Sequence, residues 1–316
     1  EFAKNCGADL VGIASMDRFE GAPMEMDPRY IFPEAKSLIA LAFRIPRGCF
    51  RGIEEGTYFS AYPAMGYANI NQIHAPIVLR AVSLFLEDNG YEAVPIQNVL
   101  VGEGNLRDVN TGKLRQRSAK RVSPDKPAPD VFFHFRIAAF IAGLGEIGYS
   151  KLLLTPEFGP RQRFAFILTD APLEPDPLFE GKICDRCMLC VRDCSGKAIS
   201  RTETVKIKVA GREIEWGKLD ELKCSVAYLG GNKETNPFLL ENVDENEYNK
   251  EFYGWGKISR CMVDNYLDHC YQELHHMPAI EGAKGCIRAC MIHLEETGKI
   301  KKTFKNPFRK RKPWKL

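Results

Sequence analysis

The stretch that decides how half of this chain folds is Cys184-Asp-Arg-Cys187-Met-Leu-Cys190-Val-Arg-Asp-Cys194. Three cysteines at intervals of three positions, followed by a fourth after three further residues, form the bacterial-type run that ligates [4Fe–4S] clusters. At this spacing the first three thiolates wrap one cuboidal cluster, and the fourth points toward a second cluster. A structural zinc site normally uses two separate cysteine pairs instead. One departure is Ser195, which stands where a proline usually follows the run.

A second cluster needs four more ligands, and the chain supplies them less regularly. Cys286 and Cys290 lie at the start of an expected helix, and Cys224 is a third candidate. A complete second run would also have a cysteine at position 283, where the chain has Ala283. By the crossover of two-cluster ferredoxins, we expect Cys290 to complete the cluster of Cys184, Cys187 and Cys190, and the other cluster to take Cys194, Cys224 and Cys286. Its fourth ligand is Cys261 or Cys270, or it is absent, which leaves a three-iron cluster.

The remaining composition is that of a large globular protein. The chain has 316 residues, 27% of them charged, and eleven cysteines. A chain of this size folds without disulfides, so we expect Cys6 and Cys49 to be buried thiols. No run approaches eighteen apolar residues, which predicts that no segment spans a membrane.

The part before the cysteine run alternates strands with helices. Short apolar runs and helical spacing predict strands at 9–15, 37–44, 91–96 and 163–169 and helices at 70–90 and 129–141. This order predicts an α/β (α+β) fold with a mixed sheet. A proline-rich linker after residue 169 separates this domain, residues 1–175, from a bacterial-ferredoxin-like iron–sulfur module, residues 176–300. In that module we expect a hairpin at 205–216, turning at Ala210-Gly211, and an inserted polar loop near 231–256.

A basic tail, residues 301–316, ends the chain. It holds eight Lys or Arg and no acid. Because the net charge of the whole chain is +3, the other residues together carry a net charge of about −5. Such a tail contacts an acidic partner, RNA or an anionic membrane surface, or it lies solvated over the acidic body. The start at Glu1-Phe2 shows neither a methionine nor a signal peptide. We expect a cytoplasmic or peripheral-membrane location, with an exported precursor as the alternative.

One glycine motif imitates a dinucleotide fingerprint. Gly143-Leu144-Gly145-Glu-Ile-Gly148 is literally GxGxxG, yet it follows an expected helix instead of a first strand. No acid ends a second strand about twenty residues on, as the fingerprint requires. A tight glycine turn that admits a large planar ligand, or another element of the fold, is the better interpretation.

The chain resembles a known superfamily over these same residues. Ala142 to Gly148, the segment Leu154-Thr-Pro-Glu-Phe-Gly-Pro-Arg161-Gln-Arg163 and the cysteine run resemble the corrinoid-dependent reductive dehalogenases and their relatives, the epoxyqueuosine reductases. The segment around Cys224 is similar to the second-cluster cysteine segment of the reductases. The resemblance is strong over about 140–225, moderate before that and weak after 230.

This resemblance implies a nitroreductase-like mixed-sheet domain joined to a two-cluster ferredoxin module. It also implies a cobalamin-type corrinoid bound base-off, with no histidine on the cobalt. The glycine turn, with Gly143, Leu144, Gly145 and Gly148, and Arg161 are its expected contacts. In the dehalogenases a tyrosine is the proton donor and a basic residue assists it. By position, Tyr67 is the expected donor, with Tyr58 and Tyr62 as rivals.

The assisting basic residue is expected to be Arg163, with Arg161 as its alternative, although an arginine here can instead pair with Glu157. Asp130 lies about one position from the aspartate of the epoxyqueuosine reductases, and the motif around that residue is absent. His134 either handles protons or is a hydrogen-bonded core histidine.

The resulting prediction is a corrinoid- and iron–sulfur-dependent reductase of reductive dehalogenase type. It would carry out a two-electron reduction of a small organic substrate at Co(I), in an anaerobic setting. Electrons would come from a low-potential donor of the ferredoxin or flavodoxin type. One alternative is an epoxyqueuosine-reductase-like tRNA enzyme, and another is an iron–sulfur electron-transfer protein that lacks the corrinoid.

Overall fold

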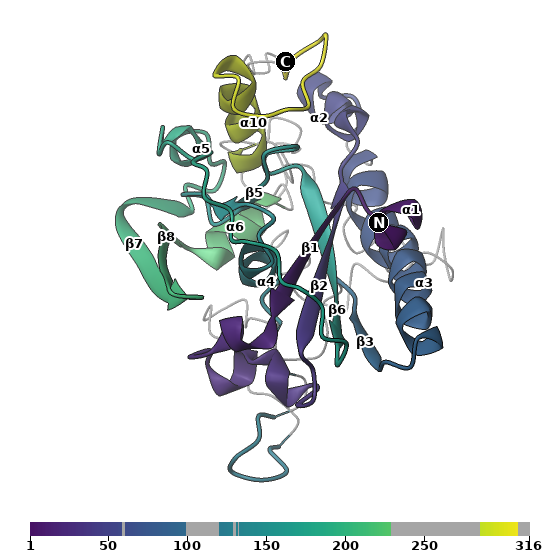
Figure 1. The fold of residues 1–316 in the computed structure, drawn as a ribbon. Coiled ribbons are helices and arrows are strands. Elements are labelled where there is room, and N and C mark those ends of the chain that lie inside the picture. Colours follow the sequence, from purple (N-terminus) through teal and green to yellow (C-terminus); the bar gives the residue numbers. More distant parts are fainter. Residues whose placement is uncertain (59–60, 99–119, 129–130, 132, 229–284, 309–316) are drawn as a thin grey trace, which may run out of the picture.

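The computed structural model describes residues 1–58, 61–98, 120–128, 131, 133–228 and 285–308 (Figure 1). The strands are β1 (Leu10–Ser15), β2 (Ser37–Arg44), β3 (Ala93–Ile96), β4 (Glu146–Ile147), β5 (Leu153–Leu154), β6 (Gln162–Thr169), β7 (Ile199–Val209) and β8 (Arg212–Leu219). The α-helices are α1 (Phe2–Asn5), α2 (Arg51–Glu55), α3 (Ala75–Asp88), α4 (Phe135–Ile141), α5 (Leu189–Arg192), α6 (Glu221–Tyr228) and α10 (Cys286–Glu296). Four short 3₁₀ helices are η1 (Met16–Phe19), η2 (Met24–Met26), η3 (Pro28–Tyr30) and η4 (Arg47–Phe50), and η5 (Tyr62–His74) is π-helical.

A four-stranded sheet in the order β1-β2-β6-β3 forms the centre of the fold. Each of its pairings is antiparallel, with Ile39 opposite Ile13 on β1 and opposite Ile167 on β6. The predicted combination of helices with a sheet is confirmed, and the four expected strands all form. The described pairings correspond to the α+β form of that prediction. On β2 only Arg44 is exposed, which explains why its sequence is a continuous apolar run instead of an alternating one.

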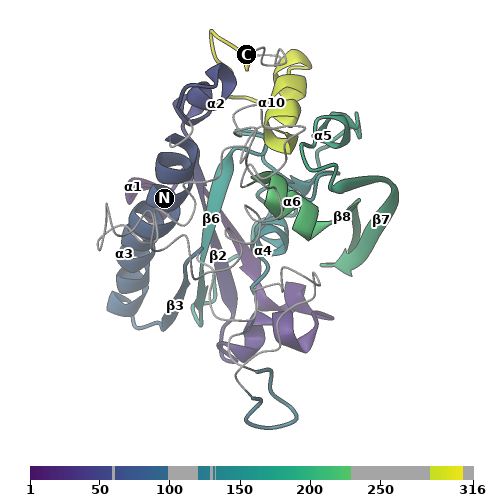
Figure 2. The same cartoon turned by 180° about the vertical axis from the view of Figure 1, so that it is seen from behind.

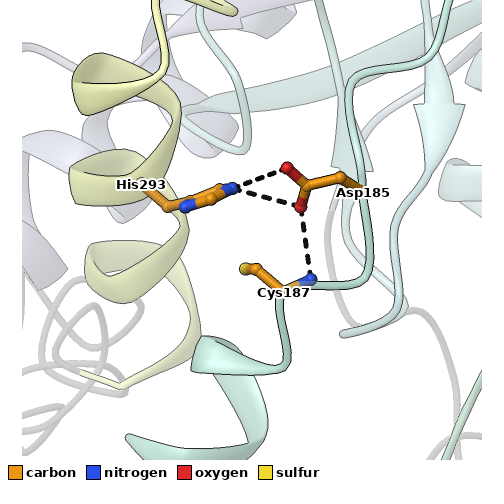
Figure 3. Close-up of side chains that lie close together, drawn as sticks. All are labelled: Asp185, Cys187 and His293. Atoms are coloured by element: carbon orange, nitrogen blue, oxygen red, sulfur yellow. Dashed lines mark hydrogen bonds and ion pairs between the residues drawn. The ribbon is translucent and has the colours of Figure 1, made fainter.

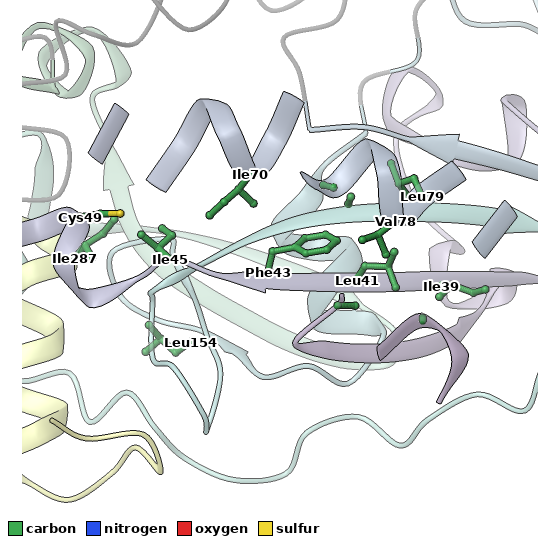
Figure 4. Close-up of a cluster of buried hydrophobic side chains, with 14 of the residues drawn as sticks. Ile39, Leu41, Phe43, Ile45, Cys49, Ile70, Val78, Leu79, Leu154 and Ile287 are labelled. Atoms are coloured by element: carbon green, nitrogen blue, oxygen red, sulfur yellow. The ribbon is translucent and has the colours of Figure 1, made fainter. Parts of the chain in front are cut away.

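Helices cover both faces of this sheet. Because successive strand residues point to opposite faces, Ile39, Leu41 and Phe43 meet α3, where Val78 and Leu79 are buried (Figure 4). The alternate β2 residues, from Leu38 to Ala42, pack instead with Phe140 and its neighbours on α4. Seen from behind, α4 lies on the side of the sheet away from α3 (Figure 2). The sheet therefore has a buried core on each side.

The helix expected at 70–90 consists of two parts. α3 begins only at Ala75 and ends before Asn89-Gly90, as the stop signal predicts, with Gly90 at φ +83°. Residues 70–74 belong to η5, a π-helix that the sequence analysis did not predict. π-helical segments are rare and often mark functional sites. Here η5 carries Tyr62 and Tyr67.

The second predicted helix is also shorter than expected. α4 starts at Phe135 instead of 129, because the His134 side chain caps it: its Nδ1 accepts a hydrogen bond from the Ile137 N–H at 3.3 Å. Of the residues before it, 129, 130 and 132 lie outside the described residues.

The predicted hairpin is confirmed. β7 and β8 pair antiparallel and turn at Ala210-Gly211, whose φ values are +49° and +73°. Two central residues with positive φ characterise the type I′ turn that suits the twist of a hairpin. The polar loop expected near 231–256 lies outside the described residues.

The C-terminal helix α10 joins the core of the main sheet. Ile287, Met291 and Leu294 belong to the same buried cluster as β2 and α3. The start of the basic tail follows α10 back over the body: Lys301 pairs with Glu157 at 2.8 Å. Residues 309–316 of the tail lie outside the described residues. No helix within the described ranges has both the length and the apolar character that a membrane crossing requires.

Candidate functional site

A first group of four cysteines forms where α10 packs against α5 and the loop before it. Burial raises the pKa of Cys290 well above its usual value, and the nearby thiols of Cys184, Cys190 and Cys187 raise it further. Burial, followed by the nearby thiols of Cys184 and Cys187, likewise raises the pKa of Cys190 to about 12. Crowded thiols that disfavour one another's ionisation need a strongly positive centre to become thiolates. An all-sulfur set of this kind suits an iron–sulfur cluster. Which cysteines share that cluster stays a prediction.

A second group of cysteines adjoins the first. Burial raises the pKa of Cys286 to about 12, and the thiols of Cys224, Cys194 and Cys190 contribute in turn. The pKa of Cys224 rises to about 11, first through burial and then through Cys194. Cys286, Cys194 and Cys184 pack against the small apolar cluster that contains Cys190, so the two groups are neighbours. Cys261 and Cys270, the candidates for the fourth ligand, lie outside the described residues.

The glycine motif supports the loop that carries the first group. Glu146, inside the motif, accepts hydrogen bonds from the backbone N–H groups of Ile183, at 2.9 Å, and of Cys184. The backbone N–H of Tyr149, just after the motif, lies 3.4 Å from the Cys184 sulfur and donates to it. The GxGxxG segment thus clamps the cysteine loop.

Close packing of the chain on itself accounts for the glycines. A Cβ at Gly143 would collide with the carbonyl oxygen of Pro177, and one at Gly145 with that of Leu154. Gly143 also has φ +77°, a conformation that glycine adopts without strain. Leu144 is buried in the core beside α4. The structure thus supports the close approach of another element; contact of these residues with a cofactor stays a prediction.

Arg163 and Tyr67 form the centre of a polar cluster between β6 and η5. The Arg163 guanidinium carbon lies 3.7 Å from the centroid of the Tyr67 ring, and Arg163 Nε donates to Asn71 Oδ1 at 3.3 Å. Desolvation acts to lower the pKa of Arg163, but Tyr67, Tyr62 and Tyr228 together leave it raised. Arg163 therefore stays charged beside Tyr67. The sequence predicted both residues of this pair, and their contact supports the prediction.

Arg136 connects this cluster to the second group of cysteines. Desolvation lowers the pKa of Arg136. Cys286 and Cys224 act to raise this pKa, and Arg163 acts to lower it. Arg136, Arg163 and Cys286 each keep part of their surface accessible, although desolvation is the largest influence on the pKa of each. All three side chains are therefore mostly, but not completely, removed from water.

A corrinoid without a protein histidine on its cobalt stays a prediction. Each described histidine uses a ring nitrogen within the fold: His74 at Gly7 O, 3.1 Å away, His134 as the α4 cap and His293 at Asp185. When bound, such a group would be held by shape and by polar contacts.

The rival tyrosines differ clearly in environment. Tyr58 is 61% exposed, at the surface beyond α2. Tyr62 is fully buried, and burial raises its pKa to about 12, although Arg163 opposes the rise. Of the three tyrosines, Tyr67 is the one that is partly accessible and also has the Arg163 guanidinium over its ring.

The other predicted polar residues lie apart from this cluster. Arg161 donates to the Ile45 carbonyl and lies 5.1 Å from the Phe304 ring centroid, and burial lowers its pKa to about 10. Glu157 pairs with Lys301. Burial lowers the pKa of His134 to about 4, which keeps the helix-capping imidazole neutral. Its structural role is evident, and a role in proton transfer stays a prediction. Asp130 lies outside the described residues.

Sequence reasoning missed a polar network at the edge of the first group. Asp185 Oδ2 accepts from His293 Nε2 at 2.8 Å, and its other oxygen accepts from the Cys187 N–H at 3.2 Å (Figure 3). Lys299 Nζ also donates to Asp185 Oδ2, at 2.8 Å. Ligand atoms of Asp185, Cys187 and His293 lie within 4.8 Å of one another. Two positions in the sequence could have predicted this network: Asp185 lies inside the cysteine run, and His293 is one turn after Cys290 on the same helix.

Comparisons with known proteins point to two groups of relatives. No protein-family profile matches the chain. The tetrachloroethene reductive dehalogenase of Sulfurospirillum multivorans is 42% identical over 115 residues, which cover 32% of this chain and 23% of that protein. The epoxyqueuosine reductase of Bacillus cereus is 25% identical over 280 residues, 80% of this chain and 60% of that protein. The chain thus spans less than two thirds of either relative.

A solved catabolic reductive dehalogenase in complex with 3-bromo-4-hydroxybenzoic acid aligns with 88% of this chain and 36% of its own, at 18% identity and a TM-score of 0.49. The curated relatives are reductases, which makes them oxidoreductases. The resemblance that the sequence predicts is therefore confirmed: this chain has homologues among both the reductive dehalogenases and the epoxyqueuosine reductases.

Proposed function

We propose that this chain is the catalytic part of a corrinoid- and iron–sulfur-dependent reductase of the reductive dehalogenase type. The observation that carries the proposal is the succession of a first cysteine group, a second cysteine group, Arg136 and the Arg163–Tyr67 pair. Ligands for electron-carrying clusters, together with a tyrosine held against a charged arginine, suit a reduction that consumes two electrons and a proton.

Each part of the chain has a role in this proposal. Residues 1–175 bind substrate and cofactor, and residues 176–300 hold the clusters. Cys184, Cys187, Cys190 and Cys290 would hold one cluster, and Cys194, Cys224 and Cys286 the other. A bound corrinoid would supply the strongly reducing cobalt centre. A low-potential ferredoxin or flavodoxin would supply the electrons.

Tyr67 donates the proton that replaces the leaving group of the substrate. Because the positive charge of Arg163 lies against its ring, the phenolate that remains is stabilised. Asn71 Oδ1 holds the guanidinium in position from one side. Tyr67 and Arg163 are both partly buried, which reduces screening by water and so strengthens this electrostatic interaction.

Replacing Tyr67 with phenylalanine is expected to lower the rate of halide release about 100-fold or more, because a positioned general acid contributes a factor of this order. Halide release from a brominated phenol, with reduced methyl viologen as the reductant, measures the effect. The matched control is Tyr58→Phe on the exposed tyrosine, which should retain the wild-type rate. Equal rates for Tyr67→Phe and the control would contradict the assignment of Tyr67.

A second candidate is an epoxyqueuosine-reductase-like activity. The relative of this type aligns with 80% of the chain, more than the dehalogenase does, although at lower identity. The same preparation should be offered an RNA stem-loop that carries epoxyqueuosine. Conversion of the stem-loop without halide release would favour this candidate. An electron-transfer protein without corrinoid would perform neither reaction.

A further inference from the structure

One thiol of the first cysteine group is exposed. Cys187 lies at the surface, whereas Cys190 is buried and Cys184 and Cys290 are partly buried. The cysteines described for the second group, Cys194 among them, are also partly buried. Electron transfer weakens steeply with distance, so a protein that delivers electrons must approach the cluster edge nearest the surface. That edge is at Cys187.

The surface around Cys187 is held in a fixed shape. Asp185 joins three segments: the cysteine loop through the Cys187 N–H at 3.2 Å, α10 through His293 at 2.8 Å, and the C-terminal segment through Lys299 at 2.8 Å (Figure 3). A preformed surface of this kind costs little ordering when a partner binds.

The charge presented outward around Cys187 is positive. Arg192, at the end of α5, pairs with Asp193 at 2.6 Å, but its side chain is 68% exposed and that of Asp193 is 37% exposed. Arg186 pairs with Glu215 with exposures of 52% and 18%. In both pairs the cation is more exposed than the anion. A partner approaching Cys187 therefore meets guanidinium groups first.

We propose that the surface formed by Cys187, Arg186, Arg192 and the Asp185–His293–Lys299 network is the docking site of a small acidic electron-carrier protein. This inference rests on the proposed function, because it requires a cluster at Cys187. Complementary charge steers such encounters and raises their rates, and an acidic carrier fits the outward guanidinium groups.

The test is the rate at which an acidic bacterial ferredoxin, in its reduced state, reduces the clusters of the intact protein, followed by the loss of cluster absorbance. At low ionic strength the double variant Arg186→Glu/Arg192→Glu should be reduced at least about tenfold more slowly than the wild type. The single variant Arg192→Glu should show a smaller decrease. High salt should bring the rates together, because it screens exposed charges.

Two controls isolate docking from other effects. Arg80→Glu makes the same charge change at an exposed position of α3, on the other side of the sheet from α5, and should keep the wild-type rate (Figure 1). Photoreduced deazaflavin, a small uncharged reductant, should reduce every variant at one rate.

The outcomes separate this inference from the proposed function. If the double variant holds wild-type iron and the ferredoxin still reduces it at the wild-type rate at low salt, the docking site is wrong. If the wild-type protein has no cluster absorbance at all, the proposed function fails first.

Discussion

Replacing Glu54 with alanine is expected to destabilise the folded protein by about 3–5 kcal/mol, because the change leaves buried cations without their counter-ion. The Glu54 carboxylate is completely buried. Arg47 Nη2 lies 3.0 Å from it, Arg51 Nη1 3.4 Å and Arg288 Nε 3.9 Å. The Arg47 and Arg288 side chains are themselves buried, so water cannot replace the lost charge.

This effect should extend to the clusters. Arg288 lies on α10 between Cys286 and Cys290, the helix residues assigned to different clusters. Loss of the Glu54 contact therefore loosens the attachment of α10 to α2 and η4, and the variant should also retain less iron. Anaerobic urea denaturation, followed by tryptophan fluorescence, measures the stability.

The matched control for this prediction is Glu55→Ala. Glu55, the next residue, pairs with Arg51 at 3.6 Å, but this pair is exposed, and such a pair contributes at most about 1 kcal/mol. Glu54→Gln, which keeps the shape and removes the charge, should resemble Glu54→Ala. Equal urea midpoints for the Glu54 and Glu55 variants would show that the buried network does not hold α10.

Alanine variants of the ligand cysteines should each lose about half of the bound iron, and their electron paramagnetic resonance spectra should fall into two classes. Cys187→Ala and Cys290→Ala should share one spectrum, and Cys194→Ala and Cys286→Ala the other. The physical reason is that the thiols crowd one another in these two sets in the folded protein.

The control is Cys6→Ala, which removes a thiol that packs beside the core. It should keep all of the iron. A spectrum of Cys290→Ala that matches Cys194→Ala instead of Cys187→Ala would reverse the crossover and contradict the assignment of α10 to both clusters.

The fold was predictable where one local signal dominated. β2 is a continuous apolar run because helices cover both of its faces, and the β7–β8 turn follows from Ala210-Gly211. The π-helix η5 was not predictable, because Pro63 and Gly66 within it weaken the helical pattern. The late start of α4 depends on the His134 cap, a side-chain contact that apolar spacing does not reveal.

The site was predictable where ligand spacing carries the chemistry. The spacing of the cysteine run predicts the first group, and the crossover predicts its partner on α10; both assignments stay predictions. Asp185 is more than one hundred residues away in sequence from His293 and Lys299, its partners in the network. The same holds for Glu54 and Arg288. No local pattern reports such contacts. Gly143 and Gly145 are needed because the carbonyl oxygens of Pro177 and Leu154 leave no room for a Cβ atom, and only the folded chain brings these carbonyls near.

The central claim, two clusters beside a corrinoid site, is tested most directly by the metal content of anaerobically purified protein from a host supplied with corrinoid. The account predicts about one cobalt and about seven or eight iron atoms per chain. Iron at that level without cobalt would contradict the corrinoid reductase and leave an electron-transfer protein.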